Sequence, residues 1–371
     1  MEQNLQTRPL GLYLHIPWCL SHCRYCNFFT LKYGRKAAEA YYRLLLSEKE
    51  LYLAHGFKEL STIYFGGGTP SLLSAEQISE LIAGLPLTPD VEITLELNPI
   101  QISPDFLQKL SSTPINRLSL GLQSMLEHEL SYLDRQHKAS DIPAKIKLLR
   151  EFGYKNISAD LIYGLPDSTL ESVKQNLNLF LALPLEHISC YLLEIHDDSE
   201  LIQDRKRIPS DELLAAQYHT IRRTIQTAGF EQYEISNFAR PGYQSRHNLL
   251  YWQGDDYLAW GASACGYFQG LRYQNPADLD SYQAMLESGK IFGRADPQAD
   301  AEADYIMMAL RLLQGMDLAT FKSRFGHDFV QGREVKLAQL SKLGLIEPQA
   351  GHIRLTPQAL FISNAVIAEL L

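Results

Sequence analysis

The sequence predicts an α/β protein: an open, partial barrel of six parallel strands, followed by a smaller and mainly helical domain. Two observations support this fold class. Between residues 10 and 193, six short apolar segments alternate with helical segments, and the connections are short. Such alternation is typical of a parallel sheet with right-handed crossovers, and six units are too few for the eight of a closed barrel. From residue 301, helices are followed by a hairpin, which indicates a separate domain.

Each predicted strand is a short apolar run that ends at a turn signal. The first run ends at Pro17, and the second ends at the three glycines 66–68. Proline and glycine interrupt strands at such positions. The six expected strands cover residues 10–16, 62–65, 91–97, 117–122, 156–163 and 187–193.

The helices between these strands have recognisable start signals. Ser74, with Gln77 three residues later, forms a capping box, and Ser103 precedes a proline at a first helical position. Residues 36–54 place apolar side chains on one broad face, as a helix that packs on a sheet requires. The expected helices begin at residue 103 and cover residues 36–54, 74–83, 126–133, 141–152 and 169–183.

The composition changes after Leu193. Residues 197–211 are polar and are expected to form a loop before a helix at 212–228, and residues 230–260 are rich in aromatics, prolines and glycines. We expect this aromatic segment to be an irregular extension of the barrel and residues 294–300 to be a linker. Helices at 301–313, 318–325 and 332–343, a hairpin at 345–355 and a helix from 357 then resemble a winged-helix arrangement.

Three domains are therefore expected: the barrel (1–196), its extension (197–293) and a C-terminal winged-helix-like domain (301–371). Winged helices often bind nucleic acid. In the last segment, however, lysines and arginines are roughly balanced by acids, so it lacks a basic footprint. For the C-terminal domain, a packing or lid role is therefore favoured over nucleic-acid binding.

The composition is that of an ordinary soluble globular protein, with a formal net charge of −9. This charge disfavours nonspecific binding to nucleic acid. The first residues are polar, and no apolar stretch is long enough to span a membrane. Three of the five cysteines are clustered, while Cys190 and Cys265 lie far apart, which suits a reducing compartment. We therefore expect a cytoplasmic protein without a transmembrane segment.

Cys19, Cys23 and Cys26 lie four and three residues apart in the segment CLSHCRYC. Cysteine thiolates are the usual ligands of iron–sulfur clusters, and three ligands on a four-iron cube leave one iron open. Zinc is one alternative, but no second Cys or His pair follows at zinc-finger distance. A disulfide is another, but it would leave one thiol over. The spacing favours a 4Fe–4S cluster over both.

The CxxxCxxC motif, preceded by YLHIPW from Tyr13 onward, resembles the radical S-adenosylmethionine (SAM) superfamily. Over nearly the whole chain the sequence is similar to the family of oxygen-independent coproporphyrinogen III oxidase, which includes a heme chaperone branch. This resemblance implies an open radical SAM barrel and SAM bound at the fourth iron of the cluster. In such proteins the cofactors carry the difficult chemistry, and the protein supplies binding, orientation and electrostatics.

The resemblance also implies which residues contact SAM. They are expected near the carboxyl ends of the strands, where function collects in parallel α/β barrels. From the residues alone, the glycines could form only a tight turn, the tyrosines could be core side chains and Glu96 could be a salt-bridged acid. The oxidase branch binds a second SAM, so the number of SAM sites stays open. The implied SAM contacts are Tyr13, Tyr25, Gly67, Gly68, Thr69, Glu96, Gln123, Arg135 and Asp160.

Residues 247–252 read HNLLYW and resemble the HNxxYW signature of the heme chaperone branch. A histidine beside large aromatic rings can ligate heme iron while the rings cover the porphyrin. The resemblance therefore implies a heme contact at His247; the alternative is a hydrogen-bonded histidine in an aromatic core. Residues 264–268, ACGYF, depart from a family segment that often reads Cys-Gly-Ala-His, so a second heme-side histidine is missing.

Two departures from the oxidase favour the chaperone branch. Phe28 stands where the oxidase carries a further cysteine, and the segment ahead of the first strand is short. The resemblance then implies a chaperone that binds heme and transfers it to an acceptor, such as a membrane respiratory protein. The alternative is the oxidase itself, a radical SAM decarboxylase of porphyrin biosynthesis, and a radical SAM enzyme with another substrate also stays open.

Because of Phe28, we expect no coproporphyrinogen oxidase activity. The sequence does not identify the heme acceptor. It also leaves open whether SAM is cleaved, whether heme is attached covalently, and the oligomeric state, a dimer included.

Overall fold

The structure, a computed structural model, describes residues 9–195 and 200–371. Its main sheet has twelve strands in the order β14-β13-β12-β11-β1-β4-β5-β6-β7-β8-β10-β9. Seven neighbouring strands of that order run parallel and form the partial barrel. They are β11 (Asp256–Trp260), β1 (Leu10–Ile16), β4 (Leu60–Gly67), β5 (Leu87–Leu97), β6 (Arg117–Gln123), β7 (Ile157–Tyr163) and β8 (His187–Leu192).

Short antiparallel strands extend both edges of the barrel. Beside β11 lie β12 (Cys265–Phe268), β13 (Leu271–Gln274) and β14 (Arg294–Ala295). Beside β8 lie β10 (Asn237–Ala239) and β9 (Glu231–Gln232).

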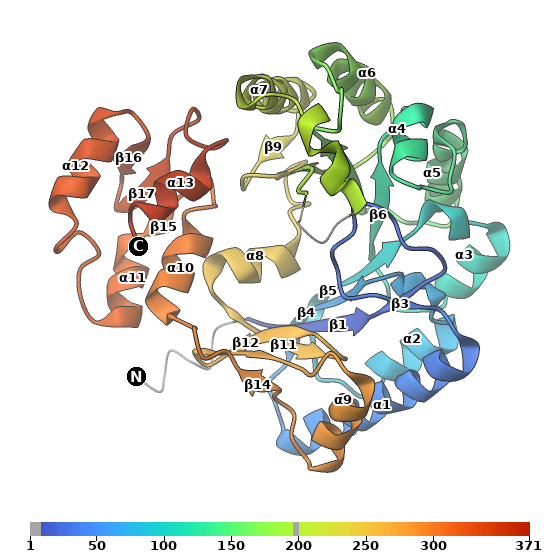
Figure 1. The fold of residues 1–371 in the computed structure, drawn as a ribbon. Helices are drawn as coiled ribbons and strands as arrows, with labels where there is room; N and C mark the ends of the chain where they lie inside the picture. The colour runs from blue at the N-terminus through green and yellow to red at the C-terminus, as the bar shows by residue number, and fades with distance from the viewer. Residues whose placement is uncertain (1–8, 196–199) are drawn as a thin grey trace.

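Helices cover the outside of the strands (Figure 1). The parallel strands bury apolar side chains against them, as expected for a sheet that helices cover. The outer helices are α1 (Arg35–His55), α2 (Ala75–Ile82), α3 (Pro104–Leu110), α4 (Glu127–Tyr132), α5 (Ile142–Glu151), α6 (Leu170–Leu181), α7 (Asp211–Thr227) and α9 (Leu279–Glu287). The described residues also form the short 3-10 helices η2 (Pro70–Leu72), η3 (Pro99–Gln101), η4 (Ala139–Asp141) and η5 (Glu200–Arg207).

The capping signals work as the sequence predicts. The Ser74 side chain accepts a hydrogen bond from the Gln77 amide, and the Gln77 side chain accepts one from the Ser74 amide. Ser103 caps α3 through the Phe106 amide. All six expected strands are present, and β1 has the predicted bounds. The α/β partial barrel is therefore confirmed.

The region after the sixth predicted strand is more regular than expected. The segment 230–260 is not simply irregular, because it contains α8 (Arg246–Gln253) and β11, which joins the barrel next to β1. The predicted loop 197–211 contains η5 within its described part. Two residues of the predicted linker form β14, which pairs with β13. These elements were missed because each is short and its partners lie far away in the sequence.

The helix α8 closes the amino-terminal end of the barrel, which we call the floor. It packs against β1, β4 and β11. The approach is close: a β-carbon at Gly11 would lie 2.5 Å from Leu250 Cδ1 and 2.8 Å from Thr62 Oγ1. The carboxyl ends of the same strands form the opposite end, which we call the rim.

The C-terminal region contains the predicted helices followed by a hairpin. Its elements are α10 (Ala301–Ala309), β15 (Met316–Asp317), α11 (Leu318–Phe325), α12 (Glu334–Lys342), β16 (Ile346–Gln349), β17 (His352–Leu355) and α13 (Ser363–Ala368). The last helix starts six residues later than expected. Figure 1 places this region beside α8, and Arg324 of α11 donates to the carbonyl oxygens of Gln253 and Gly254 at the end of α8. In the part of the chain that the structure describes, no helix has the length and apolar character needed to cross a membrane.

Candidate functional site

The cysteine segment follows β1 and is held in place by backbone hydrogen bonds. The two-residue strand β2 (Trp18–Cys19) pairs in parallel with β3 (Leu31–Lys32). The Tyr33 amide donates to the Cys19 carbonyl at 2.9 Å, and the Cys26 amide donates to the Cys23 carbonyl at 3.0 Å. The segment is therefore a closed loop whose ends are fixed at the rim.

The three thiols of this loop are half-buried and unbridged. Two of them contact side chains from other connecting segments: Thr69 Oγ1 donates to Cys19 Sγ at 3.6 Å, and Arg135 Nη1 donates to Cys23 Sγ at 3.4 Å. Burial raises the pKa of the Cys26 thiol to about 11. Because the thiolate is the metal ligand, ligation by Cys26 requires the loss of a proton.

The glycine turn after β4 packs directly on the cysteine loop. A β-carbon at Gly68 would lie 2.8 Å from the carbonyl oxygens of Pro17 and Trp18 and 2.9 Å from Cys19 Sγ, so only glycine fits there. Gly67 has a φ of +114°, which also favours glycine. Its amide donates to Glu96 Oε2 at 3.2 Å. The turn therefore links the thiols to β5.

Glu96 and Asp160 bring two half-buried carboxyl groups to the rim. Tyr64 donates to Glu96 Oε1 at 2.9 Å. Burial raises the pKa of Glu96 to about 7, and the charge of Asp160 adds to that shift. Burial also raises the pKa of Asp160 to about 6. Two acids that are costly to ionise, with few partners, suit a cationic ligand, because a positive charge stabilises their ionised forms.

Gln123, at the end of β6, has a φ of +70°, which is unusual for a residue with a side chain. The register between β6 and β7 shifts next to it. Its side chain folds back over the strand, since Gln123 Nε2 lies 3.1 Å from where a β-carbon at Gly121 would be. Arg135 Nη2 donates to the Gly121 carbonyl at 2.5 Å, so both side chains are held at the same part of the rim.

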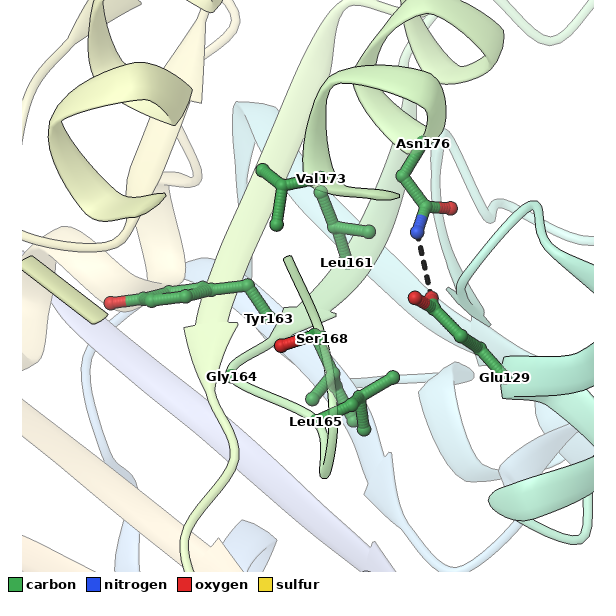
Figure 2. Close-up of a pocket in the computed structure, with 9 residues that line it drawn as sticks. Glu129, Leu161, Tyr163, Gly164, Leu165, Ser168, Val173 and Asn176 are labelled. Carbon is green, nitrogen blue, oxygen red and sulfur yellow. Dashed lines mark hydrogen bonds between the residues drawn. The ribbon is translucent and has the colours of Figure 1, made fainter. Parts of the chain in front are cut away.

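A buried polar cluster holds the chain directly after Gln123. Ser124 Oγ donates to Glu129 Oε2 at 2.6 Å, Asn176 Nδ2 donates to the same oxygen at 2.7 Å, and the Met125 amide donates to Asn176 Oδ1 at 2.7 Å. Figure 2 shows Glu129 and Asn176 facing each other beside a small cavity lined by side chains of β7 and α6. The cavity volume is about 10 Å³, room for no more than a water molecule. The cluster is therefore structural, and it fixes the strained rim segment.

Tyr13 points into the barrel and stacks on Tyr64, with ring centroids 6.2 Å apart. Its hydroxyl hydrogen-bonds to His15 Nδ1 at 3.0 Å, and His15 Nε2 hydrogen-bonds to the Phe29 carbonyl at 2.8 Å. His15 therefore ties β1 to the end of the cysteine loop. Tyr25 is half-buried, and it packs beside an apolar cluster that includes Leu133.

His247 lies at the other end of the barrel. It is fully buried, with Nδ1 2.7 Å from Thr62 Oγ1 and Nε2 2.7 Å from the Tyr251 hydroxyl. Its ring stacks on Tyr64 at 5.2 Å. Burial lowers the pKa of His247 to about 3, so the ring is neutral. The structure thus groups the nine predicted SAM contacts with the three cysteines around the rim. His247 lies instead at the floor, and both of its ring nitrogens are hydrogen-bonded.

Several polar residues of the barrel interior were not singled out from the sequence. They include Arg117, Ser119, His187, Ser189 and Tyr191. A signal was available, because these residues occupy alternate positions of β6 and β8, and alternate residues of a strand share one face. Polar residues at every second position of otherwise apolar strands indicate a polar interior.

The residues at the rim fit an iron–sulfur cluster better than a single ion. Among residues 9–195 and 200–371, no three His, Cys, Asp or Glu side chains are close enough to hold one metal ion. The three thiols are nevertheless in one loop, and cluster ligands bind different iron atoms rather than one point. The donor set is all thiol, which suits iron–sulfur clusters.

Comparisons with known proteins give a consistent result. Residues 13–180 match the family model for the Radical SAM superfamily, and residues 297–362 match the HemN C-terminal domain. The heme chaperone HemW of Lactococcus lactis is 30% identical, and the alignment covers 98% of each chain. The HemW of Haemophilus influenzae is 36% identical over 86% of each chain.

Among solved structures, the coproporphyrinogen III oxidase HemN of Escherichia coli, a radical SAM enzyme, has a similar fold. Its TM-score is 0.83 at 24% identity, and the match covers 98% of this chain and 90% of that one. At this identity the likeness concerns the fold alone.

Proposed function

This chain belongs to the HemW heme chaperone family of the radical SAM superfamily, and on that premise we propose that it binds heme and passes it to an acceptor protein. We further propose that it holds a 4Fe–4S cluster on Cys19, Cys23 and Cys26 and binds SAM at the open iron. The supporting observation is the convergence of three free thiols, a glycine turn and two acids with raised pKa values at one rim.

The rim residues have separate roles in this proposal. Thr69 and Arg135, which already donate to cysteine sulfurs, would stabilise the thiolates. Glu96, held by Tyr64 and the Gly67 amide, would bind the amino group of SAM or its ribose. A bound cluster would supply one-electron chemistry.

His247 is the proposed heme contact, and its geometry sets a condition. One ring nitrogen must accept a hydrogen bond in the present arrangement, so its lone pair is in use. Iron ligation by His247 therefore requires α8 to move and at least one of these hydrogen bonds to break. Tyr251, four residues later on α8, covers Nε2.

Heme titration of the purified protein, followed by absorption, tests heme binding and this contact together. We expect saturable binding by the wild type, weaker binding by His247→Ala and tighter binding by Tyr251→Phe, because phenylalanine uncovers Nε2. Phe268→Leu, a change in a half-buried ring of β12, serves as a control. Unchanged binding in both His247→Ala and Tyr251→Phe would remove His247 from the heme site, and absence of saturable binding by the wild type would overturn the chaperone proposal.

The alternative function, coproporphyrinogen III decarboxylation, makes a different prediction. Phe28, which stands where the oxidase has a further cysteine, is 65% exposed beside the cysteine loop. We expect no protoporphyrinogen from an anaerobic assay with SAM, a reductant and coproporphyrinogen III. Product formed at a rate proportional to protein concentration, and lost in Cys23→Ala, would favour the oxidase instead.

A further inference from the structure

The barrel interior contains a buried arginine that has no hydrogen-bond or ion-pair partner among the described residues. Arg117, at the start of β6, is 2% exposed. Its Nε is buried without a hydrogen bond, and within the described residues no hydrogen bond or ion pair involves its guanidinium. Arginine stays charged in proteins and carries five donors. A buried charge left in this state is costly, so such groups are normally paired.

The position of Arg117 is near the middle of the barrel. Its charge acts on groups from five other elements: Tyr64 of β4, Glu96 of β5, Asp160 of β7, His187 of β8 and His247 of α8. Neither acid forms an ion pair with it in the described part of the chain. The guanidinium therefore lies between the rim and the floor, inside the ring of strands.

A second unsatisfied group lies directly beside it. Thr94 of β5 is the register partner of Arg117, and its hydroxyl is also buried without a hydrogen bond. Two adjacent strands thus present a charged donor and a hydroxyl at the same level of the barrel. Buried polar groups in native proteins form hydrogen bonds with protein, water or ligand. We therefore expect a bound group to form hydrogen bonds with this pair.

Partial exposure of the interior side chains extends to Tyr64, the register partner of Thr94, although Thr94 and Arg117 are themselves buried. The inward side chains of Tyr64, Glu96 and Asp160 are partly exposed, and Tyr191 of β8 is 42% exposed. A group that enters past the SAM residues can therefore approach Arg117. At the floor, α8 closes the barrel below it.

The chemistry of the pair selects the class of occupant. A guanidinium matches a carboxylate through two parallel hydrogen bonds, and a hydroxyl can donate a third. Glu96 and Asp160 oppose an anion until a cationic ligand neutralises them. Bound SAM supplies that cation, and the guanidinium of Arg117 can then attract the anion.

We propose that Arg117, with Thr94, forms a carboxylate-binding site inside the barrel, and that it binds one propionate of the heme. The choice of heme rests on the proposed function. In this arrangement the porphyrin carboxylate lies deeper in the barrel than the SAM residues. The affinity of the site for the carboxylate increases when SAM is bound.

The test compares heme with its dimethyl ester, in which both propionates are uncharged. Both are titrated into the reconstituted protein with SAM present. Because hydrogen bonds to charged groups are strong, we expect the ester to bind about tenfold to a hundredfold more weakly than heme. Arg117→Met should bind both compounds with the weaker affinity, whereas Arg117→Lys should keep a preference for heme. Arg43→Met, at an exposed position of α1, is the matched control.

The outcomes separate this proposal from the proposed function. Absence of saturable heme binding by the wild type overturns the chaperone function itself. Equal binding of heme and ester by the wild type overturns the carboxylate site alone, and this arm needs no variant to fold. A preference for heme that survives in a folded Arg117→Met protein also overturns it. If SAM binding is weakened in that protein, Arg117 binds the SAM carboxylate instead.

Discussion

Replacing any one of Cys19, Cys23 and Cys26 by alanine should reduce the iron of the anaerobically reconstituted protein from about four atoms per chain to nearly none. The three thiols are the only protein ligands that the proposed cluster has, and the removal of one leaves two irons open to solvent. We also expect SAM binding to disappear, because its proposed anchor is the cluster. Iron analysis, the absorption spectrum and SAM titration measure these losses.

The chain provides matched controls for this experiment. Cys265→Ala changes an exposed thiol of β12, and Cys190→Ala changes a buried one of β8. Both should retain the full cluster. Because the loop thiols are only half-buried and Cys265 is exposed, the unfolding midpoint of the apoprotein should change little in these four variants. A full complement of iron in a loop variant, or zinc in the wild type, would contradict the cluster proposal.

Replacing Glu96 by glutamine should weaken SAM binding by about tenfold to a hundredfold, the range expected for the loss of a charged hydrogen bond. The side chain keeps its size, but it loses its charge, and one of its two oxygen positions becomes a donor. Both oxygens already accept hydrogen bonds, from Tyr64 and from the Gly67 amide. Glu92→Gln, on the same strand but near the floor, should leave SAM affinity unchanged.

The affinity of the wild type for SAM should also depend on pH. With a pKa of about 7, Glu96 is mostly ionised at pH 8 and mostly protonated at pH 6. If only the ionised form binds the cation, affinity should fall about tenfold over this interval. The pKa of about 6 for Asp160 adds a further loss at the lower end. Glu96→Gln should flatten the upper part of this profile, and an unchanged profile would exclude Glu96 as the controlling group.

Local signals in the sequence were sufficient for most of the barrel. The strand that ends at Pro17 and the helix capped by Ser74 are specified by neighbouring residues, so their structures match the prediction closely. The rim site was found for a similar reason. In a parallel barrel, residues that follow different strands must meet at one end, and the motif residues mark those positions.

The parts that were missed depend on distant contacts. The short strand β11 is defined by its pairing with β1, about 245 positions earlier in the chain. No local sequence pattern predicts that pairing. His247 was correctly linked to aromatic neighbours, but its place at the floor follows from the packing of Leu250 against Gly11. The lack of a hydrogen-bond or ion-pair partner for Arg117 among the described residues could not be predicted from the sequence either, because it depends on which groups surround the side chain.

The position of β1 in the sheet has a consequence for how the chain acquires its structure. One edge of β1 pairs with β4, which is synthesised soon after it. The other edge pairs with β11, which is synthesised after most of the protein, so this edge stays unpaired until then. Until then an apolar strand edge stays available to other chains, a recognised route to aggregation. The many long-range pairings also predict slow folding. A ribosome-bound chain that stops before residue 256 should therefore bind general molecular chaperones more strongly than a chain that extends beyond residue 274.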